Sequence, residues 1–81
     1  MTRDEIRTAI LEELSAIAPE VELSTLDPAA DMREAIDLDS MDILNLLIAL
    51  HKRIGIDIPE EDAGRLVTLG GAVDYLAARA G

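Results

Sequence analysis

Apolar residues recur at helical spacing in three stretches of the chain. The first stretch begins after Thr2 and Glu5, which have the spacing of a capping box. It ends before Pro19, because proline disfavours a helical conformation in the residue ahead of it. Its apolar residues follow one another at spacings of four, four and three, the pattern of one helix face: Ile6, Ile10, Leu14 and Ile17. We therefore predict an amphipathic helix between residues 2 and 18.

The strongest helical pattern runs from Ser40 to Ile54. One set of its apolar residues suffices for a core-facing side: Ile43, Leu46, Leu47, Leu50 and Ile54. A second stripe beside the first consists of Met41, Leu44 and Ile48. Together the two sets cover an arc of about 220°, whereas a surface helix needs about 100°. Either this helix is central and buried on two sides, or its second stripe contacts a partner or ligand outside the domain.

The remaining segments predict shorter elements. Residues 20–39 lack a regular period and predict a long connection, with room for a short turn of helix from Met32 to Ile36. Pro59 suits the first turn of a short helix from Glu60 to Leu66, and Thr68 suits the N-cap of a last helix. The apolar residues of that last helix are Leu69, Ala72, Val73, Leu76 and Ala77. The expected fold is all-α: a four-helix bundle of three main helices and a short third one.

Composition limits the classes of function. The chain has 81 residues, which suits one small domain, and its core must be aliphatic because Tyr75 is the only aromatic residue. The absence of cysteine excludes disulfides, zinc–thiolate sites and thiol catalysis. A net charge of −10 disfavours nucleic acid and attracts basic protein surfaces. The sequence has no apolar run of membrane-spanning length and no signal-peptide pattern, so we expect a cytoplasmic protein without a membrane span.

Catalytic and metal-binding patterns are missing from the sequence. The only histidine, His51, is more than three helical turns from Ser40, so the two cannot form a nucleophile–base pair on one helix. The acidic stretch 37–42 fails as an EF-hand loop, because its fifth position is Met41 and its sixth is Asp42 rather than glycine. We therefore expect neither a catalytic site nor a dedicated metal site, and weak binding of a divalent ion by this acidic stretch stays open.

Ser40 is the remaining candidate for chemistry. It stands among three carboxylates in the stretch DLDSMD, at the start of the strongest predicted helix. Serine is among the commonest N-cap residues, and either Asp39 or Ser40 could cap this helix. A helix N-terminus also stabilises a phosphate ester, because its free N–H groups and dipole favour negative charge. The local pattern leaves both interpretations open: a cap alone, or a site of covalent modification.

An ordered set of motifs resembles the acyl carrier protein family. Asp39-Ser40-Met41 stands where the family has Asp-Ser-Leu at the start of its second helix. The segment IALHKRIGIDIPEED is similar to the end of that helix and the acidic loop after it, and VTLGGAVDYLAA is similar to the last helix. The resemblance implies a single carrier domain over residues 1–81. It also implies that a phosphopantetheinyl transferase attaches 4′-phosphopantetheine from coenzyme A to Ser40.

The resemblance further implies how the chain would work. Family members carry acyl intermediates as thioesters on this arm and deliver them to ligases, synthases or transferases of fatty-acid, lipid or polyketide biosynthesis. Their second helix is the usual docking surface, which implies partner contacts at Asp39, Met41, Asp42, Leu44, Asn45, Ile48 and Lys52. The carrier is expected to be a monomer.

Several positions depart from the fatty-acid carriers of the family. Leu38 replaces a small residue, Asp37 replaces a glycine, and Asn45 stands where glutamate is usual. The basic run 51–53 replaces an acidic stretch, although cations at a helix C-terminus also complement the dipole. These departures favour a specialised, stand-alone carrier. The alternatives are a peptidyl or aminoacyl carrier and, in another class, a non-catalytic interaction module without the arm.

Overall fold

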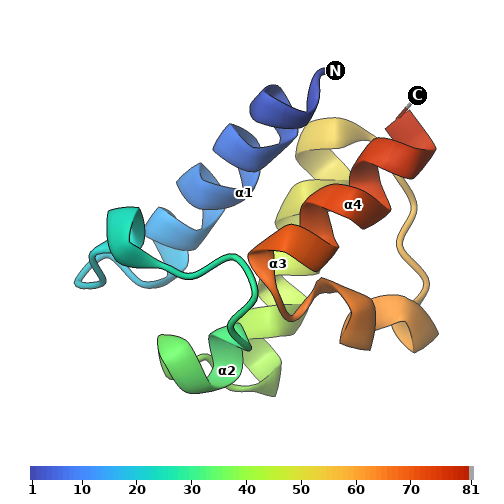
Figure 1. Ribbon diagram of the computed structural model, residues 1–81. Coiled ribbons are helices and arrows are strands. Elements are labelled where there is room, and N and C mark those ends of the chain that lie inside the picture. Colours follow the sequence, from blue (N-terminus) through green and yellow to red (C-terminus); the bar gives the residue numbers. More distant parts are fainter. Residues whose placement is uncertain (81) are drawn as a thin grey trace.

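The computed structural model describes residues 1–80 and contains helical elements, loops and one isolated β-bridge there, between Asp31 and Thr68 (Figure 1). The elements follow in the order α1 (Arg3–Ile17), η1 (Leu23–Thr25), α2 (Met32–Ala35), α3 (Ser40–Ile54), η2 (Glu60–Leu66) and α4 (Leu69–Ala80). Helix α1 packs against both α3 and α4, and η2 packs against α4 and contacts α3. The predicted all-α bundle is therefore confirmed. The short third helix lies at the predicted residues but has 3₁₀ geometry.

Local backbone features set the start of α1, where the sequence predicted a capping box, and the end of α3. The backbone N–H of Glu5 donates to Oγ1 of Thr2 at 3.1 Å, and the N–H of Thr2 donates to Oε1 of Glu5 at 2.7 Å. This capping box begins α1, and the hydrogen bond from the Thr2 backbone lowers the pKa of Glu5. Gly55 ends α3 with a φ of 81°, which glycine adopts at no steric cost.

The core is aliphatic apart from Tyr75 and draws on every α-helix. The side of α3 predicted to face the core does so, with Leu46 and Leu50 fully buried. Met32 of the short α2 is also fully buried, and Leu38 is only 4% exposed. Leu38 thus fills core volume just ahead of α3. The largest fully buried side chains are Ile6, Ile10, Leu14, Met32, Leu46, Leu50, Leu66, Leu69 and Leu76.

The long connection before α3 is fastened to the start of α4. The backbone N–H of Met32 donates to the carbonyl of Val67 at 2.8 Å, and the N–H of Gly70 donates to the carbonyl of Pro28 at 2.9 Å.

The start of α4 is capped by Thr68, as predicted: the backbone N–H of Gly71 donates to Oγ1 of Thr68 at 3.0 Å. A Cβ at Gly71 would lie 2.7 Å from that same Thr68 oxygen. Glycine has a low helix propensity, but a side chain at position 71 would collide with the Thr68 oxygen, so this position requires glycine.

Tyr75 joins α4 to η2 through its hydroxyl, which donates to Oδ2 of Asp62 at 2.6 Å. Tyr75 is 4% exposed, and the guanidinium carbon of Arg79 lies 3.6 Å from the centroid of its ring. Tyr75→Phe removes the hydroxyl and keeps the ring, so we expect the urea midpoint of unfolding at pH 7 to fall by about 0.3–1 M.

The difference in urea midpoint between the wild type and Tyr75→Phe should depend on pH, and this dependence is the control. The hydrogen bond to Asp62, together with burial, raises the pKa of Tyr75. The protonated hydroxyl therefore stabilises the folded state at pH values below the ordinary tyrosine pKa of about 10. This stabilisation is lost as the pH rises through the raised pKa that Tyr75 has in the folded state. Equal midpoints for Tyr75→Phe and the wild type at pH 7 would contradict a stabilising Tyr75–Asp62 bond.

Candidate functional site

The N-terminus of α3 is capped by Asp39 and not by Ser40. The backbone N–H of Asp42 donates to Oδ1 of Asp39 at 2.8 Å, and the N–H of Asp39 donates to Oδ2 of Asp42 at 3.2 Å. This reciprocal pair is a complete capping box, and Ser40 is the first residue inside the helix. The sequence left both Asp39 and Ser40 as candidates for the cap, and the structure assigns it to Asp39.

The Ser40 hydroxyl is consequently free for other chemistry. Ser40 is exposed, and within residues 1–80 its side chain forms no hydrogen bond. The backbone ahead of it turns sharply at Asp37, whose φ of 56° lies in the left-handed region. After this turn Leu38 enters the core while Ser40 faces solvent.

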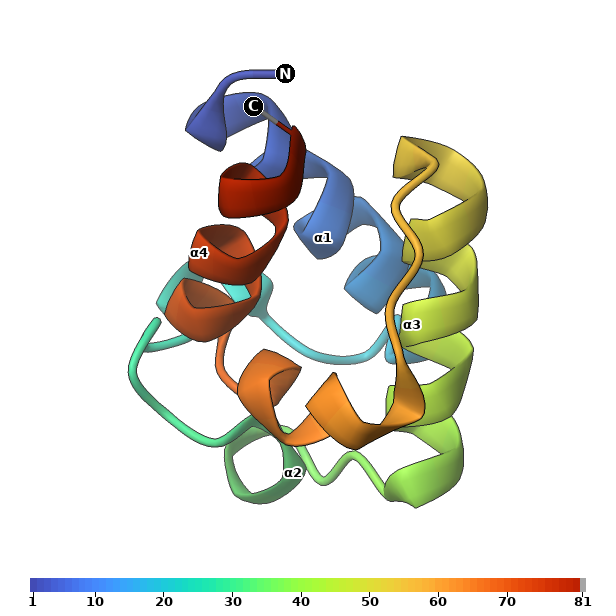
Figure 2. The same cartoon turned by 90° about the vertical axis from the view of Figure 1, so that its right-hand side faces the viewer.

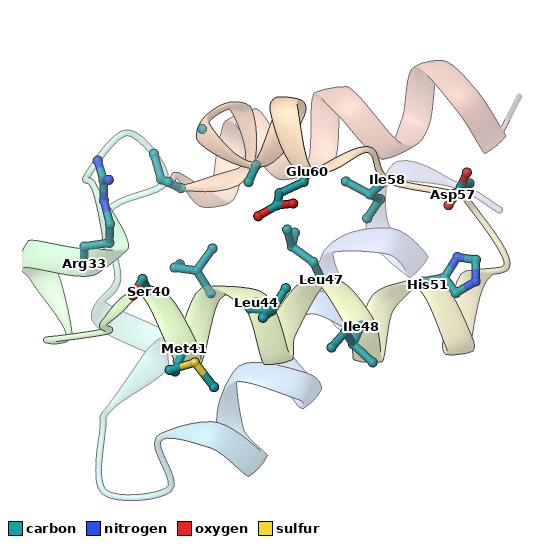
Figure 3. Close-up of a pocket in the computed structure, with 14 residues that line it drawn as sticks. Arg33, Ser40, Met41, Leu44, Leu47, Ile48, His51, Asp57, Ile58 and Glu60 are labelled. Carbon is teal, nitrogen blue, oxygen red and sulfur yellow. The ribbon is translucent and has the colours of Figure 1, made fainter.

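Ser40 stands at one end of a groove of about 750 Å³ between α3 and the segment that leads through η2. Figure 2 shows this segment returning alongside α3, and Figure 3 shows the residues that line the groove. Its apolar lining includes Ile43, Leu47, Ile58, Ala63 and Val67. His51 and Asp57 lie at the other end. From Ser40 to His51 the helix advances about 16 Å, so the groove suits a long, narrow ligand tethered at Ser40.

The second apolar stripe of α3 is exposed to solvent. Met41 is 60% exposed, Leu44 42% and Ile48 46%. The alternative that α3 is buried on two sides is therefore wrong, and the stripe is available to a partner or ligand. Of the other predicted docking residues, Asp39, Asn45 and Lys52 are exposed and Asp42 is half-buried. All seven lie on α3 or at its cap.

Two residues of the basic run at the end of α3, His51 and Arg53, have structural partners. Arg53 pairs with Glu12 at 2.5 Å and with Glu13 at 3.4 Å, which ties α3 to α1 and raises the pKa of Arg53. Nδ1 of His51 lies 2.9 Å from the carbonyl oxygen of Ile56 and so holds the loop after α3. His51 and Ser40 are at opposite ends of the helix, far outside the reach of a hydrogen bond (Figure 3).

Some lining residues were not assigned any role from the sequence. Arg33 of α2 shares the Ser40 end of the groove, and Glu60 lies along its length (Figure 3). They come from segments that meet α3 only in the folded chain. The sequence signal for Arg33 is weak: one basic residue within an acidic stretch. Within residues 1–80, no group of three or more histidine or acidic side chains is arranged to hold a metal ion.

Comparisons with known proteins agree with this geometry. Residues 4–76 match the family model described as phosphopantetheine attachment site. An acyl carrier protein of Rubrobacter xylanophilus is 37% identical over 76 residues, covering 94% of this chain and 93% of its own. An acyl carrier protein of Helicobacter pylori is 31% identical over 71 residues, covering 84% of this chain and 91% of its own.

The chain belongs to the acyl carrier protein family. The solved structure of the acyl carrier protein from Enterococcus faecalis superimposes with a TM-score of 0.82 at 26% identity, covering 96% of this chain and 98% of that one. Acyl carrier proteins are modified by phosphopantetheinyl transferases and work with acyl-processing enzymes. None of the helices within residues 1–80 has the length and apolar character needed to cross a membrane.

The acyl carrier protein cofactor is covalently attached 4′-phosphopantetheine, and the site fits this group. Attachment needs a hydroxyl that is accessible and not required by the fold, and Ser40 meets both conditions. The arm also needs a path along the surface, which the groove provides. When attached, the arm supplies the terminal thiol that a chain without cysteine lacks.

Proposed function

We propose that Ser40 is the residue modified with 4′-phosphopantetheine, and that the chain carries acyl intermediates on this arm between enzymes of fatty-acid, lipid or polyketide biosynthesis. The observation that carries the proposal is the free hydroxyl of Ser40. It is exposed at the start of α3 because Asp39 provides the cap, and it opens onto the groove. We place this activity in the cytoplasm, in a monomer with one carrier domain.

The surface around Ser40 supports the delivery step. Met41, Leu44 and Ile48 form an exposed apolar stripe that begins one residue after Ser40. A partner enzyme that covers this stripe would bring its active site to the arm. The net charge of −10 would guide basic surfaces of such enzymes to the carrier, because opposite charge raises the rate of encounter.

The test is the intact mass of the protein before and after incubation with a broad-specificity phosphopantetheinyl transferase, Mg²⁺ and coenzyme A. We expect a gain of one phosphopantetheine. Trypsin cleaves after Arg33 and Lys52 and releases peptide 34–52, whose only hydroxyl is that of Ser40. The added mass should therefore remain on this peptide. A folded, unmodified protein that gains nothing would refute the proposal and favour the interaction module without an arm.

Leu44→Glu tests the docking stripe. Leu44 is 42% exposed, so the substitution should leave folding intact but place a charge where a partner surface must lose its water. We expect kcat/KM of the transferase to fall by about 10–100-fold, the range of an interface hot spot. Ala16→Glu is the matched control, because it adds the same charge at an exposed position of α1. Equal losses in both variants would show that charge alone, and not the stripe, is responsible.

A further inference from the structure

Arg33 is fixed at the end of the groove where Ser40 lies. The backbone of its neighbour Met32 is hydrogen-bonded to Val67, and the Met32 side chain is fully buried. This hydrogen bond belongs to an antiparallel β-bridge between Asp31 and Thr68, and a separate one runs from the N–H of Gly70 to the carbonyl of Pro28 at 2.9 Å. Because α2 is held by these contacts, the chain cannot easily move Arg33 away from α3. Figure 3 shows Arg33 and Ser40 at the same end of the groove, one from α2 and the other from α3.

The guanidinium of Arg33 is oriented by Asp31. Nε of Arg33 donates to Oδ1 of Asp31 at 3.0 Å, and Nη2 donates to Oδ2 at 2.6 Å. This side-on pair uses two of the five guanidinium N–H groups. The Arg33 side chain is 53% exposed, so its remaining donors are accessible. An arginine held in this way loses little further side-chain freedom when it binds a second anion.

Arg33 is also the only lysine or arginine among the groove-lining residues that the structure describes. The residues around Ser40 are acidic, with Asp37, Asp39 and Asp42 within three positions of it. A phosphodiester on Ser40 would add another negative charge to this cluster. Arg33 is the cation placed to compensate it, because guanidinium groups bind phosphate oxygens through charge-assisted hydrogen bonds.

We propose that Arg33 binds the phosphodiester of the phosphopantetheine arm and thereby directs the arm into the groove rather than into solvent. This inference rests on the attachment at Ser40 proposed above. The Asp31–Arg33 pair would then act as a preformed phosphate clamp on α2. A purely local role of the pair, in which Asp31 only caps α2, predicts no change at Arg33 when the arm is attached.

Nuclear magnetic resonance of the carrier alone tests the contact without any acyl-processing enzyme. The wild type labelled with ¹⁵N is compared before and after transferase treatment, with attachment verified by mass. The Nε–H signal of Arg33 should shift on attachment, and that of Arg7, an exposed residue of α1, should not. In modified Arg33→Gln the ³¹P signal of the phosphodiester should shift from its wild-type position, with partial recovery in Arg33→Lys. Arg7→Gln, with the same change in net charge, should match the wild type.

Each outcome has a distinct meaning. An unmoved Arg33 signal in the wild type, together with one ³¹P position for all four proteins, would overturn the clamp while leaving attachment at Ser40 intact. Equal ³¹P shifts in Arg33→Gln and Arg7→Gln would also overturn it, since they would reflect net charge alone. Failure of the wild type to gain mass would instead refute the proposed function. If Arg33→Gln does not fold, the wild-type comparison and Arg33→Lys still decide the question.

Discussion

Ser40→Ala is expected to abolish phosphopantetheine attachment completely and to change the free energy of unfolding by no more than about 0.5 kcal/mol. Attachment is lost because alanine has no oxygen to form the phosphodiester. Stability is kept because the capping box of α3 consists of Asp39 and Asp42, and within residues 1–80 the Ser40 side chain forms no hydrogen bond. Intact mass after transferase treatment measures the first effect, and urea unfolding of the unmodified proteins measures the second.

Asp39→Ala is the matched variant, one residue away with the opposite expectation. It removes the N-cap oxygen that accepts from Asp42, so unfolding should cost about 0.5–2 kcal/mol less than in the wild type. The hydroxyl of Ser40 remains in this variant, so attachment should still be detectable. If Ser40→Ala proved as destabilising as Asp39→Ala, Ser40 would have a structural role that this geometry does not contain.

Leu46→Ala is expected to lower the free energy of unfolding by about 2–5 kcal/mol, the range for a fully buried leucine. Leu46 is 0% exposed and lies in the middle of α3, among core residues of this helix and its neighbours. Small domains have a total stability of about 5–15 kcal/mol, so this one substitution threatens the folded state itself. Chemical unfolding followed by circular dichroism is the measurement, with the midpoint and slope both recorded.

Leu44→Ala is the control, because it makes the same chemical change two residues earlier on the same helix. Leu44 is 42% exposed, so its truncation creates no closed cavity and should cost about 0.5 kcal/mol or less. The contrast separates the two apolar faces of α3: one stabilises the bundle, and the other is free for partners. Similar losses in Leu44→Ala and Leu46→Ala would mean that the second stripe is also part of the core.

Much of the fold was determined by the sequence through short-range physics. The capping residues Thr2 and Thr68 act on backbone groups within one helical turn, so residue spacing alone revealed them. The core side of α3 followed from helical periodicity, because an aliphatic stripe must be removed from water. The DSM motif and the segments after it likewise revealed the family from the order of residues alone.

Other features depended on contacts between residues far apart in the chain. Only the tertiary structure showed that the stripe of Leu44 is exposed, since the periodicity of α3 allows burial on both sides. The groove exists because the segment through η2 returns alongside α3, and Arg33 reaches it because α2 is fastened to Val67. The choice of Asp39 over Ser40 as the cap required the actual backbone geometry at that turn. Sequence spacing specifies a helix and its faces, but which faces meet is decided by how the whole chain packs.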